Sequence, residues 1–326
     1  MSTELDEQIA RLEERAETLR SILKFAWRAF VIEFAGTPKS GKSTSVEAVR
    51  HFFTRQGFRV HVLTERAAQC PIPMKGHLFF NTWCATSMLA ELLQNIETDT
   101  DIVIVDRGLL DALVWLVLQE QRGEVTQDEA RIIESFLLLE RWRGLIDLVV
   151  VMNVSPEEAI AREVSQRITS KPGSIMNPKT LQVLSDSVRL TVERYGHRFG
   201  AVVVHETPGQ TVKQAGANLA EKVLDRFREF IDPEILVVPR TKLEVLPLEA
   251  KGAFGEAATR EALNCVSTHG VFMRRSVAEA SDQFVQIISA GMLTYNDQVF
   301  LFQRKEQDPK YRLYGKTAIF QATHVN

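Results

Sequence analysis

Eight consecutive residues have the spacing G-x-x-x-x-G-K-S, which is typical of a loop that binds phosphate groups: Gly36, Thr37, Pro38, Lys39, Ser40, Gly41, Lys42 and Ser43. Backbone N–H groups around such glycines close on a phosphate, and the N-terminus of a following helix adds a positive dipole end. In this pattern the lysine reaches the β- and γ-phosphates, and the serine hydroxyl holds Mg²⁺. We therefore predict that residues Gly36 to Thr44 bind a nucleoside triphosphate, with ATP and Mg²⁺ as the expected cofactors.

A second candidate group follows an apolar run at residues 102–105, where Asp106 and Arg107 stand side by side. A carboxylate at the carboxyl end of a buried strand beside the loop is placed to orient Mg²⁺ together with Ser43. The Arg107 guanidinium could grip a phosphate of an acceptor molecule. A simple ion pair with Asp111, one helical turn further on, explains Arg107 equally well.

Glu65 and Arg66 end another strand-like run, at residues 61–64. A carboxylate there could take a proton from an acceptor hydroxyl or help to hold the metal. A surface charge pair between the two residues is the simpler alternative.

The fourth candidate group is a basic helix that opens with Ser155 and Pro156, residue types that favour a helix start. It carries Arg162 and Arg167 and leads into a break near Pro172. We expect these arginines to belong to a lid that closes over the triphosphate and neutralises developing charge. A solvated basic face is the alternative.

The elements that must position these groups alternate strictly between strand and helix. Apolar strand-like runs are expected at residues 30–35, 61–64, 102–105, 148–152 and 201–204, and helices at 44–53, 88–96, 109–121, 127–142 and 212–230. Strands that are apolar throughout, with helices between them, predict an α/β fold: a parallel five-stranded sheet with helices on both faces.

The chain of 326 residues is long enough for two domains. Residues 1–27 are expected to form an amphipathic helix, residues 28–230 the α/β domain, and residues 231–326 a smaller α+β domain. Apolar residues in the first helix follow a spacing of four and three: Leu5, Ile9, Leu12, Ala16, Leu19 and Leu23. This seam predicts either a short coiled coil that joins protomers in a homo-oligomer or a helix packed on its own domain.

The composition excludes several classes of protein. The formal net charge of −3 gives no signal for nucleic acid or for acidic membranes, and no run approaches 18 apolar residues. Three scattered cysteines, Cys70, Cys84 and Cys265, argue against a disulfide framework and for a reducing compartment. We therefore expect a cytoplasmic protein with no membrane partner.

Residues 28–230 resemble the P-loop nucleoside and nucleotide kinases, and thymidylate kinase is the most similar in layout. The resemblance is carried by the loop, by residues 105–108 (VDRG), by residues 155–167 and by the strand and turn at 201–209. It implies a P-loop NTPase-type fold, an acceptor nucleotide or nucleoside, and catalytic roles for Lys42, Asp106, Arg107, Arg162, Arg167 and Glu65. The chain departs from thymidylate kinases at Ala35, where they carry an acid, and at residues 83–87, which lack their Asp-Arg pair. These departures argue against thymidine monophosphate as the acceptor.

Residues 231–326 resemble the opening half of a Nudix-type domain, through the segments 235–240, 272–275, 298–303 and 313–316. The catalytic box of that family is absent. Gly255 and Glu261 fit its first two positions, but His269 and Gly270 stand where Arg and Glu belong. The resemblance therefore implies an incomplete domain with no hydrolase site.

Three functional hypotheses follow from the sequence. The first is a phosphotransferase that passes the γ-phosphoryl group of ATP in line to a nucleotide or nucleoside. The second is a regulatory NTPase or nucleotide sensor coupled to the C-terminal domain. The third is a bifunctional kinase and Nudix protein. A pocket beside Asp106 for an acceptor, formed by Glu65, Arg66 and residues 79–87, would distinguish the first from the second.

Overall fold

The structure is a computed structural model that describes residues 2–23, 26, 28–96, 99–166, 175–243 and 256–291, together with short strands up to residue 324. The chain divides into two compact units, Met1–Ile231 and Asp232–Asn326. No helix of the described ranges is both long and apolar enough to cross a membrane.

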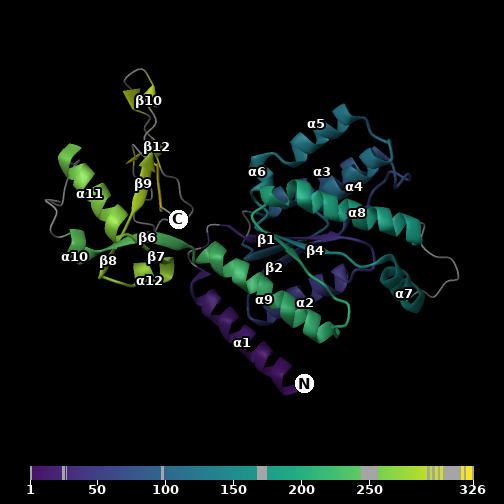
Figure 1. The fold of residues 1–326 in the computed structure, drawn as a ribbon, viewed down its shortest axis with the longest axis horizontal. Helices are drawn as coiled ribbons and strands as arrows, with labels where there is room; N and C mark the ends of the chain where they lie inside the picture. The colour runs from purple at the N-terminus through teal and green to yellow at the C-terminus, as the bar shows by residue number, and fades with distance from the viewer. Residues whose placement is uncertain are drawn as a thin grey trace. The chain divides into compact units, whose positions relative to one another are not determined.

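The first unit is built on a parallel sheet of five strands, which confirms the predicted fold class (Figure 1). The strands are β1 (Phe30–Gly36), β2 (Val60–Leu63), β3 (Ile102–Asp106), β4 (Leu148–Met152) and β5 (Val202–Val204). Their order is β2-β3-β1-β4-β5, and every neighbouring pair is parallel. The loop strand β1 therefore lies at the centre, between β3 and β4, and all five carboxyl ends share one edge of the sheet.

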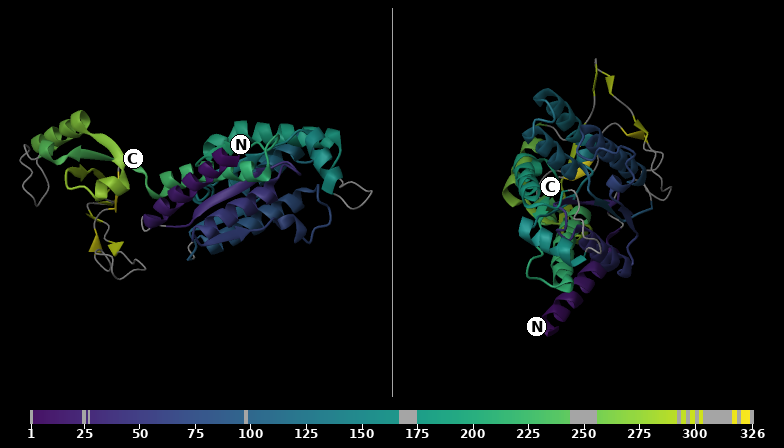
Figure 2. Two further views of the ribbon diagram at one scale, coloured as in Figure 1. Left: turned by 90° about the horizontal axis from the view of Figure 1, so that it is seen from below. Right: turned by 90° about the vertical axis from the view of Figure 1, so that its right-hand side faces the viewer.

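Helices cover both faces of this sheet (Figure 2), which explains why its strands are apolar throughout. One face is covered by α1 (Ser2–Ser21), α2 (Lys42–Arg55) and α9 (Val212–Ile231). The other is covered by α3 (Leu78–Asn95), α4 (Leu109–Gln121), α5 (Gln127–Leu137) and α8 (Pro178–Tyr195). Alternate residues of β1 divide between the two cores: Phe30, Ile32 and Phe34 face the first group of helices, Val31 and Ala35 the second.

The helix predicted at residues 127–142 is wrong in one respect, because the chain breaks at Leu138 and Leu139. Helix α5 ends at Leu137 and a short helix, α6 (Glu140–Arg143), follows. The turn brings the Trp142 ring to 5.0 Å from the Phe136 ring and lets the Trp142 indole N–H donate to the Phe136 carbonyl. Tertiary packing of Trp142 therefore overrides the continuous helical pattern.

Helix α1 uses its apolar seam within the first unit. Leu12, Ala16 and Leu19 are buried in the core that α9 also enters, and Leu5 and Ile9 pack against the same core. Arg15 adds ion pairs to Glu221 and Asp225 of α9. The apolar seam therefore packs on its own domain, as in the second of the two predictions. Residues 2–21 belong to the α/β unit rather than to a separate segment.

The second unit contains a small antiparallel sheet in the order β7-β6-β8, formed by β6 (Glu234–Pro239), β7 (Val271–Arg274) and β8 (Phe284–Gln286). Its helices are α10 (Arg240–Leu243), α11 (Glu256–His269) and α12 (Arg275–Glu279). Short antiparallel pairs complete it: β9 (Ile288–Gly291) with β14 (Gln321–His324), β10 (Thr294–Tyr295) with β11 (Gln298–Val299), and β12 (Phe302–Gln303) with β13 (Thr317–Ala318).

This arrangement gives no support to the Nudix resemblance. Glu261 and His269, expected in or near a catalytic box, lie in the single helix α11. Gly255 and residues 313–316 lie outside the described residues. No hydrolase function is carried forward for this unit.

Candidate nucleotide-binding site

The phosphate loop connects the carboxyl end of β1 to the start of α2, and its glycines are required by the backbone. Gly36 has φ +132°, and a Cβ there would stand 1.9 Å from the carbonyl oxygen of Met152. Gly41 has φ +97° and directly precedes α2. A left-handed backbone at Lys39 (φ 58°) completes the turn. The loop can thus direct backbone N–H groups and a helix N-terminus toward one point.

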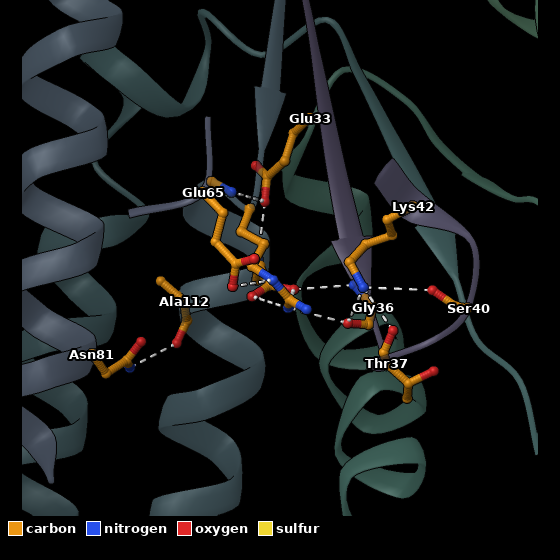
Figure 3. A network of polar contacts seen from close by, with 11 residues as sticks. Glu33, Gly36, Thr37, Ser40, Lys42, Glu65, Asn81 and Ala112 are labelled. Carbon is orange, nitrogen blue, oxygen red and sulfur yellow. Dashed lines mark hydrogen bonds and ion pairs between the residues drawn. The ribbon is translucent and has the colours of Figure 1, made fainter. Parts of the chain in front are cut away.

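The side chain of Lys42 reaches back to the start of this loop (Figure 3). Its Nζ donates to the carbonyl oxygens of Gly36 at 3.1 Å and Thr37 at 2.6 Å, and contacts the Ser40 hydroxyl at 3.5 Å. Burial and the nearby Arg107 guanidinium lower the pKa of Lys42 to about 7. An anionic phosphate at the loop would favour the charged ammonium and would give it a stronger partner than a carbonyl.

A cavity of about 570 Å³, here called the loop cavity, opens in front of the phosphate loop. Its lining includes six of the nine predicted phosphate-binding residues: Pro38, Lys39, Gly41, Lys42, Ser43 and Thr44. Gly36, Thr37 and Ser40 are buried and do not contribute to the lining. Residues from 207–216 also line the cavity, and there Gly216 lies against Ala48 of α2.

Asp106 and Ser43, the predicted Mg²⁺ ligands, both line the loop cavity. Asp106 ends β3 and pairs in register with Phe34 of β1, two residues before the loop. Burial raises the pKa of Asp106, and Arg107 opposes that shift. No cluster of three or more His, Cys, Asp or Glu side chains in the described ranges could hold a metal alone. A hydroxyl and one carboxylate nevertheless suit Mg²⁺, which usually takes its remaining ligands from substrate phosphates and water.

Arg107 is held by two carboxylates. Its Nε lies 2.8 Å from Glu65, and its Nη1 lies 3.0 Å from Asp111 and also donates to the Gly36 carbonyl oxygen at 3.3 Å. Burial works against the charge, but Asp111 and Glu65 together keep the pKa of Arg107 above its ordinary value. The residue adopts φ 67°, an uncommon conformation for a side chain of this size. The ion pair with Asp111, one of the two interpretations of Arg107 from the sequence, is therefore found, while the grip on an acceptor phosphate stays a prediction.

Asp111 ties this network to the phosphate loop. Its carboxylate accepts the Gly36 N–H at 3.0 Å as well as the Arg107 guanidinium, and only 3% of the residue is exposed. Sequence reasoning assigned Asp111 only an ion pair with Arg107, and missed the contact with the loop.

Glu33 is a further residue that sequence reasoning missed. It lies in the middle of β1, fully buried, and its Oε1 accepts the backbone N–H groups of Asp111 at 2.9 Å and Gly108 at 3.2 Å (Figure 3). Burial raises the pKa of Glu33 to about 7. The carboxyl group therefore holds the N-terminus of α4, which carries Asp111. The sequence signal that could have revealed Glu33 is a single acidic residue inside an otherwise apolar strand.

Arg162 of α7 (Pro156–Gln166) reaches the loop cavity from the expected lid. Its guanidinium donates to the Lys39 carbonyl oxygen and to the Thr207 hydroxyl, both at 3.1 Å, and pairs with Glu158 at 2.7 Å. The predicted helix start is also found, because the Ser155 hydroxyl accepts the Glu158 N–H at 3.2 Å. Arg167 lies outside the described residues.

A second cavity, of about 510 Å³ and here called the side cavity, lies beside the first. Its walls come from the segment that follows β2, from α3 and from one face of α4, and they include Arg66, Phe80, Asn81, Cys84, Trp115 and Gln119. Pro38, Glu65 and Arg107 line both cavities. Of the aromatic residues within the predicted acceptor segment 79–87, Phe80 lines the side cavity, whereas Phe79 is 66% exposed and Trp83 does not line it.

Comparison with known proteins gives a partial match. The model of the family "Methylmalonyl Co-A mutase-associated GTPase MeaB" matches residues 3–68, the segment from α1 through the phosphate loop to the end of β2. No curated protein matches the chain. The match covers less than half of the chain, and with the fold and the loop it supports a P-loop NTPase that handles a nucleotide.

Three solved structures of deoxyadenosine kinase from M. mycoides are similar to the chain. They contain, respectively, the products dCMP and a flexible dCDP, bound dCTP, and bound dATP. Each structure has a TM-score of 0.46 to this chain, and the sequence identities are 18%, 18% and 19%. Each alignment includes 60% of this chain, and it includes 100%, 100% and 99% of the respective kinase chains. Scores of this size carry no residue or activity over to this protein.

Proposed function

We propose that the protein is a Mg²⁺-dependent phosphotransferase that moves the γ-phosphoryl group of a nucleoside triphosphate to a nucleoside-sized acceptor. One observation carries this proposal: the side cavity adjoins the loop cavity, and Pro38, Glu65 and Arg107 line both. A switch that only binds or hydrolyses a nucleotide has no need of a second cavity at that junction.

In the proposed reaction the triphosphate lies in the loop cavity, with its γ-phosphate near Lys42 and Arg162. Mg²⁺, held through Ser43 and Asp106, would neutralise charge on the β- and γ-oxygens. Lys42 and Arg162 stabilise the charge that builds on the transferring group, and the fixed loop N–H groups do so without reorganisation.

The acceptor's reacting group is proposed to be an uncharged hydroxyl rather than a phosphate. Arg107, the cation nearest the junction, is already neutralised by Glu65 and Asp111. Arg66, the next cation, pairs with Glu91. Two further cations, Lys75 and Arg122, line the side cavity but not the loop cavity. At the junction itself a dianionic phosphate would meet cations that are already paired, whereas a hydroxyl would find in Glu65 a base for its proton. The hydroxyl oxygen attacks the γ-phosphorus, the bond to the β–γ bridging oxygen breaks, and the proton passes to Glu65.

A regulatory GTPase is the second candidate, favoured by the match of the GTPase family model to residues 3–68. In that case the nucleotide would be hydrolysed by water, and the side cavity would have no catalytic role.

A labelling experiment separates the two candidates. The protein is incubated with Mg²⁺ and γ-labelled ATP or GTP, alone and with each common nucleoside or nucleoside monophosphate, beside a Lys42→Ala control. We expect one nucleoside to become labelled by the wild-type protein and to stay unlabelled with the Lys42→Ala control. Release of free phosphate only, unchanged by every acceptor, would reject the phosphotransferase and leave the GTPase.

A further inference from the structure

Two of the three cysteines meet at the wall of the side cavity. Cys84, in α3, lines the cavity, and Cys70 follows the short 3₁₀ helix η2 (Arg66–Ala68). The Cys84 thiol forms a side-chain hydrogen bond with Cys70, and both residues are half-buried, so a small reagent can reach them. The third cysteine, Cys265, lies in the second unit, where its thiol donates to the Lys242 carbonyl oxygen at 3.5 Å.

The segment that carries Cys70 is attached to α3 by other contacts as well. The Cys70 backbone N–H donates to the Arg66 carbonyl oxygen at 3.1 Å, which fixes the cysteine at the end of η2. Arg66 in turn forms an ion pair with Glu91 of α3, and η2 packs on that helix. The fold therefore holds the two thiols together, and their contact is not a chance approach of two surface side chains.

The surroundings of Cys84 decide the order in which the two thiols react. Burial, with a smaller contribution from Cys70, raises the pKa of Cys84 to about 12. Because the thiolate is the nucleophile, Cys84 reacts poorly by itself with an oxidant in solution. Cys70 therefore meets the oxidant first, and Cys84 is placed to attack the product.

We propose that Cys70 and Cys84 are a reversible redox pair, which a peroxide converts into a disulfide in the wall of the side cavity. With hydrogen peroxide, the Cys70 sulfur attacks one oxygen, the O–O bond breaks, and a sulfenic acid and one water form. The Cys84 sulfur then attacks the Cys70 sulfur, the S–O bond breaks, and a second water leaves. Two thiols thus give two electrons and two protons to one peroxide. Disulfides that form in reducing compartments are usually of this transient kind.

The expected consequence, which rests on the proposed function, is a loss of acceptor transfer with nucleotide binding retained. A disulfide holds its sulfurs about 2.05 Å apart, closer than any non-bonded contact, so η2 and α3 must shift toward each other. Glu65, the proposed base, directly precedes η2. Since a displacement of about 1 Å can cost about 100-fold in rate, kcat/KM for the acceptor should fall about tenfold or more. Neither cysteine lines the loop cavity.

Peptide mapping tests the disulfide without any assay of activity. The reduced protein is treated with hydrogen peroxide, its remaining thiols are alkylated, and it is cleaved with trypsin. Lys75 lies between the two cysteines, so trypsin places them in separate peptides, residues 67–75 and 76–107. We expect these peptides to be joined and to separate on treatment with dithiothreitol. Peptides that stay separate, with Cys70 and Cys84 alkylated or oxidised singly, would overturn the proposal.

Two variants connect the disulfide to its effect on transfer. Cys70→Ser changes a side chain that lines neither cavity, so it should transfer phosphate like the reduced wild type and become insensitive to peroxide. Cys265→Ser is the matched control and should keep both the disulfide and the sensitivity. Sensitivity that persisted in Cys70→Ser would assign the inactivation to another residue. If Cys70→Ser does not fold, recovery of wild-type transfer by dithiothreitol, in step with loss of the joined peptides, provides the test.

The outcomes distinguish this inference from the function on which its consequence rests. If no acceptor receives label but the two peptides are joined, the phosphotransferase proposal fails and the disulfide stands. If an acceptor is labelled and the peptides stay separate, the disulfide is wrong while the proposed function stands. If the peptides are joined and transfer is unchanged, the pair does not control the side cavity.

Discussion

The loop cavity and the side cavity are similar in size, about 570 and 510 Å³, and both walls carry cations, but only the side cavity adds aromatic rings. The loop cavity presents backbone N–H groups and the cations Lys42 and Arg162. The side cavity presents the amides of Asn81 and Gln119 and the rings of Phe80 and Trp115. It also carries Arg66, Lys75 and Arg122, and at the junction carboxylates pair with Arg107. The difference suits a polyanion on one side and an uncharged ring system with a hydroxyl on the other.

The largest expected effect lies in the loop cavity. Lys42→Ala should lower phosphoryl transfer about 10³-fold, because it removes a preorganised cation from the transferring group. Lys213→Ala, which loses only an exposed pair with Asp6, is the matched control and should keep full activity. Steady-state kinetics of both variants measure this effect. If Lys42→Ala transferred phosphate as fast as Lys213→Ala, the loop cavity would not hold the triphosphate.

At the junction, Glu65→Gln should lower kcat for acceptor transfer about 10²-fold, since the acceptor hydroxyl loses its base. Binding of the nucleotide, and any slow hydrolysis without acceptor, should change little. Glu120→Gln alters a carboxylate that pairs with Arg194 instead and should leave transfer intact. A loss of nucleotide affinity that matches the loss of transfer would place Glu65 in nucleotide binding alone and contradict its role as a base.

Arg162→Ala should weaken binding of the nucleotide but not binding of the acceptor. Removing this guanidinium from the loop cavity should raise the KM for the nucleotide about tenfold and leave the KM for the acceptor within twofold. Arg189→Ala, at an exposed position of α8, provides the comparison. Parallel shifts of both KM values would mean that the two cavities do not function as separate binding sites.

Glu33→Gln should affect stability far more than activity. The folded pKa of Glu33, about 7, lies above the unfolded value near 4.5, so its neutral form favours the folded state. That stability is fully present below pH 4.5, is lost as the pH rises toward 7, and stays lost above it. Each pKa unit corresponds to 1.4 kcal/mol, so the free energy of unfolding of the wild type should fall by roughly 3 kcal/mol relative to Glu33→Gln.

Denaturant unfolding of both proteins at pH 4.5, 6 and 8 measures this difference. Transfer activity of Glu33→Gln at neutral pH should stay within about threefold of the wild type, because the amide oxygen still accepts the Gly108 and Asp111 N–H groups. Glu33→Val, which removes both hydrogen bonds, should lose far more activity. A pH-independent difference would show that Glu33 is ionised in the folded protein.

The loop cavity was largely predictable from the sequence and the side cavity was not, for a physical reason. The phosphate loop is one contiguous segment whose glycines encode its conformation, and Asp106 follows a run of β-branched residues that predicts its strand. The side cavity is assembled mainly from residues 65–85 and 107–122, with Pro38 and Ile175, and their shared wall exists only after α3 packs on α4.

Two other features could not be predicted from the sequence for the same reason, because both depend on packing between distant segments. The α1 seam fits a coiled coil or an internal partner equally well, and only α9 decides between them. The spacing of Arg107 and Asp111 predicts their ion pair, but the hydrogen bond from Gly36 to Asp111 joins residues 75 positions apart.

The most direct test of the two-cavity proposal is whether nucleotide and acceptor bind at the same time. The nucleoside identified by labelling is titrated calorimetrically into protein saturated with Mg²⁺ and a non-hydrolysable ATP or GTP analogue. We predict one bound acceptor per chain, with an affinity equal to or higher than that for the nucleotide-free protein. Competition between the two ligands for a single site would contradict the proposal.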